Sequence, residues 1–376
     1  MLIHYVSGSR ADFGLMEKTL IGLSGLPELQ IYVVVTGQHL LPTYGNTIKD
    51  ILASGLPLAG QIPVALSGAD GAEMGRALAT ELVGFLDLWS KDRPDLVLVL
   101  GDRGEMLAAT LAAVHLGIPV GHLHGGELSG TLDESFRHAI SKLAHFHFAA
   151  NEESAERLRR MGERPEHIWV VGAPGLVGLA DGIRHDDGWL ARTLPLRPGQ
   201  YHRALVVFHP VVQEAASAAQ QIETLLETLN NEGCAALVLR PNSDAGGASI
   251  NAYLDRMQAE GWLTVIDHFN RESYLAALAQ ADALVGNSSS GIIESASLGT
   301  PCLNLGSRQN GRLRNGNVVD CAEFNIPAIS QALRRTLAMK GPFENLYGDG
   351  RTIERLGAVL PSLPLDQAVL AKRNAY

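Results

Sequence analysis

The chain has 376 residues, 46% of them apolar and 19% charged, which is the balance of a globular protein long enough for two α/β domains. Its net charge of −10 argues against a nucleic-acid partner, because binding to a phosphate backbone requires a basic surface. No apolar run approaches the roughly 18–20 residues that span a bilayer, so we expect no membrane partner. Three scattered cysteines without a CxxC motif, and a first strand with no signal peptide before it, predict free thiols in a cytoplasmic protein.

Short β-rich runs alternate with helical patterns along the whole chain. In chain order, we predict strands over residues 2–6, 31–35, 96–100, 119–123, 146–149, 169–171, 204–208, 235–239, 263–266, 283–286 and 302–305. Helical patterns lie between them, for example over residues 105–116, 154–161, 214–230 and 271–280. Most strands are continuous apolar runs, as expected for parallel strands covered on both faces. The repeated alternation therefore predicts an α/β fold with parallel sheets.

The alternation is interrupted near residues 180–203, where charged residues, a tryptophan and Pro/Gly punctuation follow one another. We therefore expect one doubly wound, Rossmann-like domain over residues 1–180 and a second over residues 181–350. Residues 351–376 are expected to form a C-terminal helix that packs back on the first domain. Since open α/β sheets bind ligands beyond the carboxyl ends of their strands, motifs that directly follow strands are the candidate functional sites.

Two such motifs lie in the first 105 residues. Residues 7–14 (SGSRADFG) form a Gly/Ser turn that opens a helix, and its free N–H groups together with Arg10 would bind an anion. The structural alternative is a helix cap with a surface arginine. Residues 101–105 (GDRGE) place Asp102 and Arg103 at the end of an apolar strand. Helix capping by Asp102 is the alternative there, but two charged residues against a buried strand favour a functional role.

The richest motif begins with residues 121–127 (GHLHGGE). His122 and His124 are two residues apart at a strand end, so they could share a face and bind a metal. No further Cys, His or carboxylate spacing resembles a metal signature, and we therefore expect no metal.

A helical pattern follows this Gly-rich loop. Asp133, Arg137 and Lys142 recur in it at helical spacing, and they would form either a solvated face or part of an active site. Their position directly after the loop favours the active site. His145 and His147, which come next, are interpreted as structural.

Motifs also follow the predicted strands of the second domain. They are residues 208–210 (FHP), 240–244 (RPNSD), 267–269 (DHF), 286–294 (GNSSSGIIE) and 306–312 (GSRQNGR). A turn of three serines and a glycine that enters a helix supplies N–H and hydroxyl donors for a diphosphate, whereas a simple helix cap would need one serine. Glu294, one turn further along, is suited to accept a hydrogen bond from a ribose diol.

Taken together, these segments resemble the UDP-N-acetylglucosamine 2-epimerase family, and specifically its hydrolysing branch of sialic-acid synthesis. The matching segments are SRADFG, GDRGE, HGGELSGTLDESFRHAISKLAHFHF, FHPV, RPNSDAG, GNSSSGIIES, LGSRQNGR and LYGDG, in the family's order from residue 9 to residue 350. The resemblance implies two Rossmann-like domains that face each other across a cleft, as in B-type glycosyltransferases. It also implies a homodimer or homotetramer.

The resemblance extends to individual residues. With the motifs, it predicts that the UDP-sugar contacts Arg10, Gly14, Arg103, Glu127, His209, Asn242, His268, Phe269, Ser288, Ser289, Ser290, Gly291, Glu294, Arg308 and Arg312. The expected catalytic set, of which the resemblance implies the two carboxylates, is Asp102, His124, Asp133, Arg137 and His209. Many relatives have an acid–base glutamate where this chain has His124. Either His124 takes over that proton transfer, or a neighbour such as Glu127 or Glu134 does.

The implied reaction converts UDP-N-acetylglucosamine and water to N-acetylmannosamine and UDP. No carbonyl acidifies the C2 proton, so the anomeric C–O bond must break first, and loss of UDP and of the C2 proton gives a 2-acetamidoglucal. Water then adds at C1 and a proton at the other face of C2, which requires a base and an acid but no metal and no nicotinamide cofactor. The alternatives are the hydrolysing 2-epimerase of UDP-N,N'-diacetylbacillosamine in legionaminic-acid synthesis, a glycosyltransferase of the same architecture, and a catalytically silent UDP-sugar sensor.

Overall fold

A computed structural model of the full chain describes residues 1–42, 45–65, 71–130, 133–179, 188–241, 246–259, 263–267 and 269–375. The expected site residues Asn242 and His268 lie outside the described residues. The chain divides into two compact units. The first unit comprises Met1–Glu127, Leu132–Gly178 and Tyr347–Tyr376, and the second comprises Leu128–Thr131 and Leu179–Leu346.

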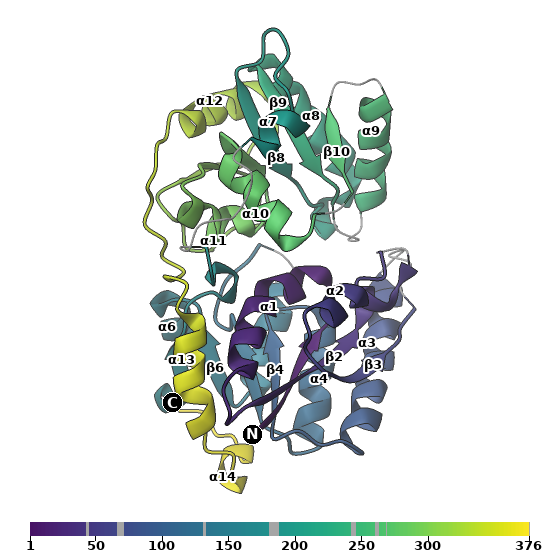
Figure 1. The fold of residues 1–376 in the computed structure, drawn as a ribbon, viewed down its shortest axis with the longest axis vertical. Helices are drawn as coiled ribbons and strands as arrows, with labels where there is room; N and C mark the ends of the chain where they lie inside the picture. The colour runs from purple at the N-terminus through teal and green to yellow at the C-terminus, as the bar shows by residue number, and fades with distance from the viewer. Residues whose placement is uncertain are drawn as a thin grey trace. The chain divides into compact units, whose positions relative to one another are not determined.

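Within the described residues, the first unit forms a sheet of seven parallel strands in the order β3–β2–β1–β4–β5–β6–β7 (Figure 1). The strands are β1 (Leu2–Ser7), β2 (Gln30–Thr36), β3 (Leu58–Ile62), β4 (Leu96–Leu100), β5 (Val120–Leu123), β6 (Phe146–Ala149) and β7 (Ile168–Val170). The order reverses between β1 and β4, as it does in the Rossmann fold.

Helices cover both faces of this sheet. They include α1 (Arg10–Ser24), α2 (Ile48–Ala53), α3 (Gly71–Trp89), α4 (Gly104–His115), α5 (Asp133–Leu143), α6 (Glu152–Arg160), α13 (Thr352–Val359) and α14 (Gln367–Leu370). On one face, α1 and α13 pack against strand residues such as Tyr5, and on the other, α3, α4 and α5 pack against residues such as Val6. Successive strand side chains thus enter different cores, which explains why most strand residues are apolar and why apolar and polar residues do not alternate.

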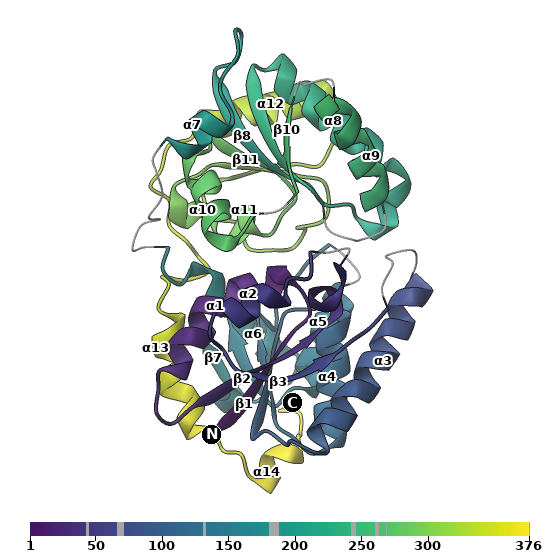
Figure 2. The same ribbon diagram turned by 45° about the vertical axis from the view of Figure 1, so that its right-hand side comes forward.

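The second unit repeats this arrangement on a smaller scale (Figure 2). Its described strands pair in the order β10–β9–β8–β11–β12–β13, and all are parallel. They are β8 (His202–Val207), β9 (Cys234–Leu239), β10 (Thr264–Ile266), β11 (Ala283–Gly286), β12 (Cys302–Leu305) and β13 (Val318–Cys321). The helices are α7 (Trp189–Thr193), α8 (Ala218–Asn231), α9 (Gly247–Ala259), α10 (Arg271–Gln280), α11 (Ser290–Ile293) and α12 (Ile326–Leu337). α8, α9 and α12 share the core of one face, and α7 and α10 share that of the other.

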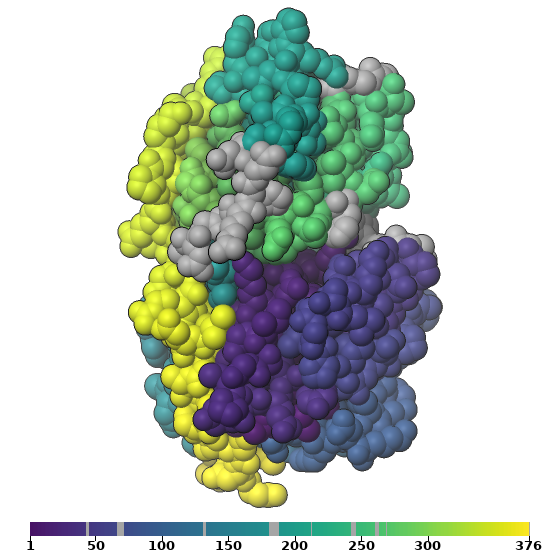
Figure 3. All heavy atoms as spheres, viewed as in Figure 1, coloured from purple at the N-terminus to yellow at the C-terminus, as the bar shows by residue number. Residues whose placement is uncertain are grey.

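The C-terminal segment belongs to the first unit, where α13 lies along α1 (Figure 3). The two helices approach closely because each has a glycine at the contact. A Cβ atom on Gly22 would lie 2.6 Å from Ile353, and one on Gly357 would lie 2.8 Å from Leu26.

The expected fold class, with two doubly wound Rossmann-like sheets as in B-type glycosyltransferases, is confirmed. Two strands were missed, β3 and β13. Both are edge strands, and polar residues such as Gln61 and Asp320 interrupt their apolar runs. The helix expected from residue 214 begins at Ala218, after a short 3-10 helix over Val212–Ser217. Of the helices that the structure describes, none combines the length and the apolar character needed to cross a membrane.

Candidate active site

The polar motifs of the first unit gather at the carboxyl ends of β1, β4 and β5, beside the point where the strand order reverses. In Rossmann-like sheets this point is the usual ligand site. The turn after β1 lies against the turn after β4, because a Cβ atom on Gly8 would lie 2.3 Å from Oε1 of Glu105. Arg103 donates from Nε to the same oxygen over 2.6 Å. A side chain at position 8 would therefore displace the ion pair that orders the second turn.

The turn after β1 differs from the expected anion site in one respect. Ser9 and Asp12 form a capping box at the start of α1, and the Asp12 carboxylate accepts the N–H groups of Gly8 (3.2 Å) and Ser9 (2.7 Å). These two N–H groups are therefore already bonded. Arg10 is the first residue of α1 and is half-buried, and burial lowers the pKa of its guanidinium. Gly14 lies one turn further along the same helix, also half-buried.

Glu81 is a buried acid near these turns that the sequence did not single out. It lies on α3, and its Oε1 is 2.9 Å from the hydroxyl of Thr36 at the end of β2. Burial and the charge of Glu105 raise the pKa of Glu81 to about 8, so the group is mainly protonated at neutral pH. The helical pattern of α3 alone does not distinguish such a position from a surface glutamate.

Asp102 and Arg137, both predicted as catalytic, form an ion pair in the first unit. The Arg137 side chain is only 2% exposed, and its Nη1 also donates to the Glu127 carbonyl over 3.1 Å. The contacts join the turn after β4, helix α5 and the loop after β5. Because an adjacent cation favours the charged form of an acid, Arg137 stabilises Asp102 as a carboxylate. Asp133, half-buried, is the first residue of α5 and lies four residues before Arg137, on the same side of the helix.

His124 adopts a left-handed backbone conformation, with φ of +60°. This conformation is unusual for a residue with a side chain, and it often marks functional sites. The imidazole Nδ1 lies 2.5 Å from Oε1 of Glu127, and the His124 side chain is 11% exposed. Gly126 allows the loop to pass α6 closely, since a Cβ atom there would lie 2.3 Å from the Ser154 carbonyl oxygen. The loop therefore holds the His124 imidazole in a fixed orientation against a carboxylate.

His122 has a different environment from His124, and the two do not share a face as a strand would place them. His122 is buried on β5, whereas His124 lies beyond the strand end. Nε2 of His122 is 2.7 Å from the Gly101 carbonyl and Nδ1 is 3.0 Å from the Ser141 hydroxyl. Burial lowers the pKa of His122 to about 3, so the ring is neutral, with Nε2–H donating to Gly101 and Nδ1 accepting from Ser141. In the part of the chain that the structure describes, no three His, Cys, Asp or Glu side chains are grouped as metal ligands.

Buried neutral histidines predict a loss of stability in mild acid. Burial lowers the pKa of His122 to about 3, and that of His145, next to the charge of Lys372, to about 4. The unfolded chain binds these protons near pH 6.5, so the free energy of unfolding should fall as the pH drops from 6.5 to 4, by up to about 1.4 kcal/mol per pH unit for each histidine. Urea unfolding of wild type and His122→Gln at pH 7.5, 6.5 and 5.5 measures this. An equal pH dependence in the two proteins would contradict the assignment.

In the second unit, His209 follows β8 and is held by Asn287, which follows β11. Oδ1 of Asn287 accepts the His209 N–H (2.7 Å), and Nδ2 of Asn287 donates to the His209 carbonyl (2.7 Å). Burial, together with the charge of Arg308, lowers the pKa of His209 to about 3. The imidazole is thus neutral, and it would offer a diphosphate an N–H group.

The serine-rich turn after β11 leads into the single-turn helix α11. The Gly291 N–H bonds to the Ser288 carbonyl, and the Ser288 and Ser290 hydroxyl groups are 3.0 Å apart. Close packing also requires a glycine at position 291, since a Cβ atom there would lie 2.5 Å from Sγ of Cys302. The half-buried Ser289 and the N–H groups at the start of this turn remain the best candidates for a diphosphate.

Glu294, expected at a ribose, is buried and forms an ion pair with Arg271 at the start of α10. Tyr274 on the same helix bonds to the Ser290 hydroxyl, and burial raises the pKa of that phenol. The sequence did not point to Arg271 or Tyr274. The available signal was their position directly after the residue 267–269 motif, at the carboxyl end of β10.

The remaining predicted residues of the second unit surround the same strand ends. Arg308 donates from Nη1 to the Asn287 carbonyl over 3.2 Å, and Arg312 follows it, half-buried. Gln309, not predicted, donates to the same carbonyl over 2.8 Å. Phe269 stacks edge-on against Trp189, with ring centroids 5.7 Å apart. Most of the predicted nucleotide contacts thus occupy one edge of the second sheet.

Two Rossmann-like units with polar residues at their strand ends define a protein of the B-type glycosyltransferase architecture. Residues 23–361 match the family model of UDP-N-acetylglucosamine 2-epimerase, and the chain belongs to this family.

Curated relatives cover the chain almost completely. The chain is 43% identical to the UDP-N,N'-diacetylbacillosamine 2-epimerase (hydrolyzing) of Legionella pneumophila, over 100% of this chain and 99% of the relative. It is 32% identical to the GDP/UDP-N,N'-diacetylbacillosamine 2-epimerase (hydrolyzing) of Campylobacter jejuni, over 85% and 84% of the two chains. It is also 32% identical to the UDP-N-acetylglucosamine 2-epimerase of Neisseria meningitidis serogroup B, over 90% and 88%.

Solved structures share the fold. The UDP-GlcNAc 2-epimerase of Methanocaldococcus jannaschii, in complex with UDP-GlcNAc and UDP, superposes with a TM-score of 0.79, at 18% identity and over 96% of this chain and 99% of that one. A UDP-GlcNAc 2-epimerase from Neisseria meningitidis, bound to UDP-GlcNAc, gives the same TM-score, identity and coverage. At this identity the likeness establishes the architecture.

Proposed function

We propose that this family member is a hydrolysing 2-epimerase whose substrate is UDP-N,N'-diacetylbacillosamine. The observation that carries the proposal is the 43% identity, over the full length of both chains, to the L. pneumophila enzyme that bears this name. The C. jejuni relative is likewise named as a hydrolysing 2-epimerase of the diacetylbacillosamine nucleotide. The sequence interpretation ranked UDP-N-acetylglucosamine first, and the relative named for that substrate is 32% identical. The identities therefore favour the substrate that was ranked second.

The proposed chemistry begins with elimination. The anomeric C–O bond breaks, UDP leaves with the electron pair, a base takes the C2 proton, and a C1–C2 double bond forms. Asp102, kept as a carboxylate by Arg137, is suited to accept that proton. Water then adds its hydroxyl group to C1, and an acid protonates C2 on the opposite face. His124, oriented by Glu127, is suited to the second transfer, with Asp133 as the further candidate of this unit.

The second unit is proposed to bind UDP. Departure of a diphosphate is helped by hydrogen-bond donors and cations that are already in place. Ser288, Ser289 and the guanidinium of Arg308 lie at neighbouring strand ends and offer such groups. His209 adds a neutral N–H donor. The negative charge of a bound diphosphate would favour protonation of its other ring nitrogen, because an adjacent negative charge stabilises the imidazolium form.

One experiment tests both the substrate and the mechanism. Purified protein is incubated without acceptor in heavy water that also carries an oxygen-isotope label, with UDP-N,N'-diacetylbacillosamine or with UDP-N-acetylglucosamine. We expect release of UDP and of a free sugar that is inverted at C2 and carries one deuterium there. We also expect kcat/KM to be at least about tenfold higher for the diacetylated substrate. With UDP-N-acetylglucosamine, a polar group of the pocket would lack its partner on the sugar, and this lowers kcat/KM by about tenfold or more. Faster turnover of UDP-N-acetylglucosamine would reverse the substrate assignment. Solvent oxygen in UDP rather than at C1 would contradict elimination.

Glu294 gives a separate prediction for nucleotide binding. Glu294→Gln keeps the shape of the side chain but removes the charge, and we expect it to weaken UDP binding by about 1–3 kcal/mol, the value of a hydrogen bond to a charged group. Isothermal titration with UDP measures the change. The matched control is Glu272→Gln, because Glu272 is an exposed residue of the neighbouring helix α10. Equal UDP affinities of the two variants would argue against a ribose contact by Glu294.

The proposal also covers the cellular location, the oligomeric state and the pathway of the enzyme. Cys234, Cys302 and Cys321 are free thiols in the structure, which supports a reducing, cytoplasmic location. The resemblance to the family supports a homodimer or homotetramer, which light scattering at several protein concentrations would test. The pathway that fits the proposed substrate is legionaminic-acid synthesis rather than sialic-acid synthesis.

A further inference from the structure

The last residues of the chain bind to the end of α5, the helix that carries Asp133 and Arg137. The ammonium group of Lys372 donates to three carbonyl groups at the end of α5, those of Ser141 (3.0 Å), Lys142 (2.9 Å) and Ala144 (2.5 Å). Carbonyl groups in the last turn of a helix have no partner within the helix. A cation there also complements the negative end of the helix dipole. Lys372 therefore serves as the C-terminal cap of α5, supplied from 231 residues away.

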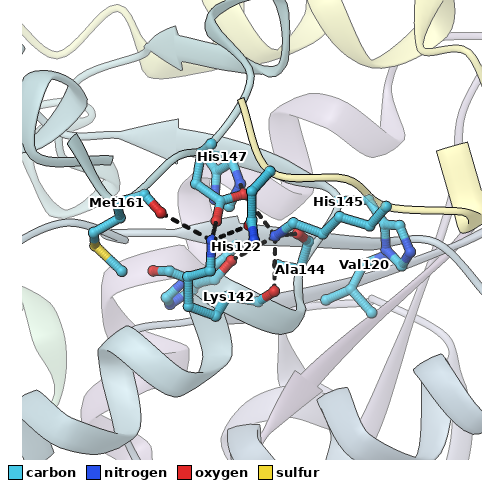
Figure 4. Close-up of polar contacts among 11 residues, drawn as sticks. Val120, His122, Lys142, Ala144, His145, His147 and Met161 are labelled. Atoms are coloured by element: carbon cyan, nitrogen blue, oxygen red, sulfur yellow. Dashed lines mark hydrogen bonds and ion pairs between the residues drawn. The ribbon is translucent and has the colours of Figure 1, made fainter. Parts of the chain in front are cut away.

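A buried carboxylate holds this cap in place. Glu163 forms an ion pair with Lys372 (2.6 Å), and it accepts hydrogen bonds from Lys142 over 2.7 Å and from Nε2 of His147 over 2.9 Å. Burial would raise the pKa of Glu163, but the hydrogen bonds from His147 and the two lysines outweigh burial and lower the pKa to about 2. Glu163 is thus ionised throughout the neutral range. Figure 4 shows His147 and Lys142 converging in this cluster, with His122 beside them.

The cluster continues to the candidate catalytic turn. Ser141, whose carbonyl group accepts from Lys372, donates its hydroxyl group to Nδ1 of His122. Nε2–H of His122 in turn donates to the Gly101 carbonyl, and Gly101 directly precedes Asp102. An unbroken series of hydrogen bonds therefore leads from the C-terminal tail to the turn that carries Asp102.

Other contacts fix the tail in the same place. The Ala375 N–H donates to the Gly162 carbonyl over 2.8 Å, and Lys142 donates to Oδ1 of Asn374 over 2.6 Å. At the other side of the cluster, the His145 N–H bonds to the Val120 carbonyl at the start of β5. The end of α5 is thus attached to both the tail and the strand before the His124 loop. The α5 helix has fewer ways to shift along its axis while these contacts hold.

We propose that Lys372 is a positioning residue for the reaction: it holds α5 in the register at which Arg137 meets Asp102, and through Ser141 and His122 it holds the Asp102 turn. The expected effect on turnover rests on the proposed function, whereas the expected effect on the order of α5 does not. None of the UDP contacts predicted within the described part of the second unit takes part in the cluster. Loss of Lys372 should therefore reduce turnover and leave nucleotide binding intact.

The kinetic test uses the full chain with Lys372→Met, Lys372→Arg and the control Arg373→Met, whose side chain is exposed next to Lys372. Misplacing catalytic groups by about 1 Å lowers the reaction rate on the order of 100-fold, so we expect Lys372→Met to lower kcat by about 10- to 100-fold. The KM and the Kd for UDP should stay within about twofold, since both report mainly uniform binding. Lys372→Arg, which keeps the charge and the donors, should recover a large part of kcat, and Arg373→Met should resemble wild type.

Hydrogen–deuterium exchange provides the readout that does not depend on any activity. In Lys372→Met, faster exchange is expected in peptides covering residues 136–144 and 99–106, with the second unit unchanged. If wild type releases no UDP from either sugar nucleotide, the proposed function fails, while this exchange pattern still tests the cap. Unchanged exchange in α5 would overturn the inference. So would faster exchange with an unchanged kcat, or exchange that rises uniformly over the first unit together with a lower melting temperature in both lysine variants.

Discussion

Asp102→Asn should lower turnover by about 10²- to 10⁴-fold, the usual contribution of a group that transfers a proton in the rate-limiting step. The amide keeps the shape of the side chain but cannot accept the C2 proton. It also removes the negative charge that pairs with the Arg137 guanidinium, which is only 2% exposed. Removing one partner of a buried ion pair typically costs about 3–5 kcal/mol of stability, so the variant should also unfold at a lower urea concentration. Steady-state UDP release and urea unfolding measure the two effects.

The double variant Asp102→Asn/Arg137→Gln separates them. Replacing both charges by amides removes the uncompensated guanidinium, so most of the lost stability should return. The second amide can still donate toward the Glu127 carbonyl, which Arg137 now contacts. Turnover should stay low, because no carboxylate has been restored. If the double variant regained turnover together with stability, Asp102 would be a structural partner of Arg137, and the base would have to be another residue.

His124 is expected to be the second residue with a large effect. His124→Asn should lower turnover by about 10²- to 10⁴-fold if the imidazole transfers a proton at C2. Asparagine tolerates the left-handed backbone better than most residues do, so the φ of +60° is retained at little cost in stability. His124→Glu, which introduces the acid–base residue that the family resemblance implies at this position, should regain part of the turnover. Measuring kcat and the melting temperature for each variant compares chemistry with folding.

Chemical rescue distinguishes the proton-transfer role of His124 from a structural one. His124→Gly removes the imidazole and relieves the left-handed strain, since glycine adopts positive φ freely. If His124 transfers a proton, added imidazole should raise the turnover of this variant in a saturable way. If His124 only holds the loop through Glu127, imidazole should have no effect, and His124→Asn should keep near-normal turnover. That result would leave the chemistry to Asp102 and Asp133.

The fold was predictable because its signals are local. β4, β6, β11 and β12 have the predicted bounds, because they are mainly apolar and a strand covered on both faces turns most of its side chains toward a core. β3 and β13 were missed because edge strands are covered less and tolerate residues such as Gln61 and Asp320. The C-terminal helix was expected on the first domain, and the structure assigns Tyr347–Tyr376 to the first unit.

The candidate site was predictable in outline for the same reason. Parallel strands place their carboxyl ends at one edge of the sheet, so Asp102 after β4 and the His124 loop after β5 had to lie near each other. The sequence did not indicate that Glu127 would contact His124, or that Arg271 would hold Glu294. Charged residues near strand ends are too common for their partners to be identified from spacing alone.

The sequence by itself determined most of the strands, the doubly wound fold class and the position of each polar motif, because these follow from periodicities of a few residues. Only the tertiary structure decided which charges meet. The Asp102–Arg137 pair joins residues 35 apart, and the Lys372 cap on Ser141 joins residues 231 apart. It also decided that His122 is neutral and buried while His124, two residues later, carries a strained backbone against Glu127. Such contacts depend on how whole elements pack, and burial then fixes the charge and orientation of each group.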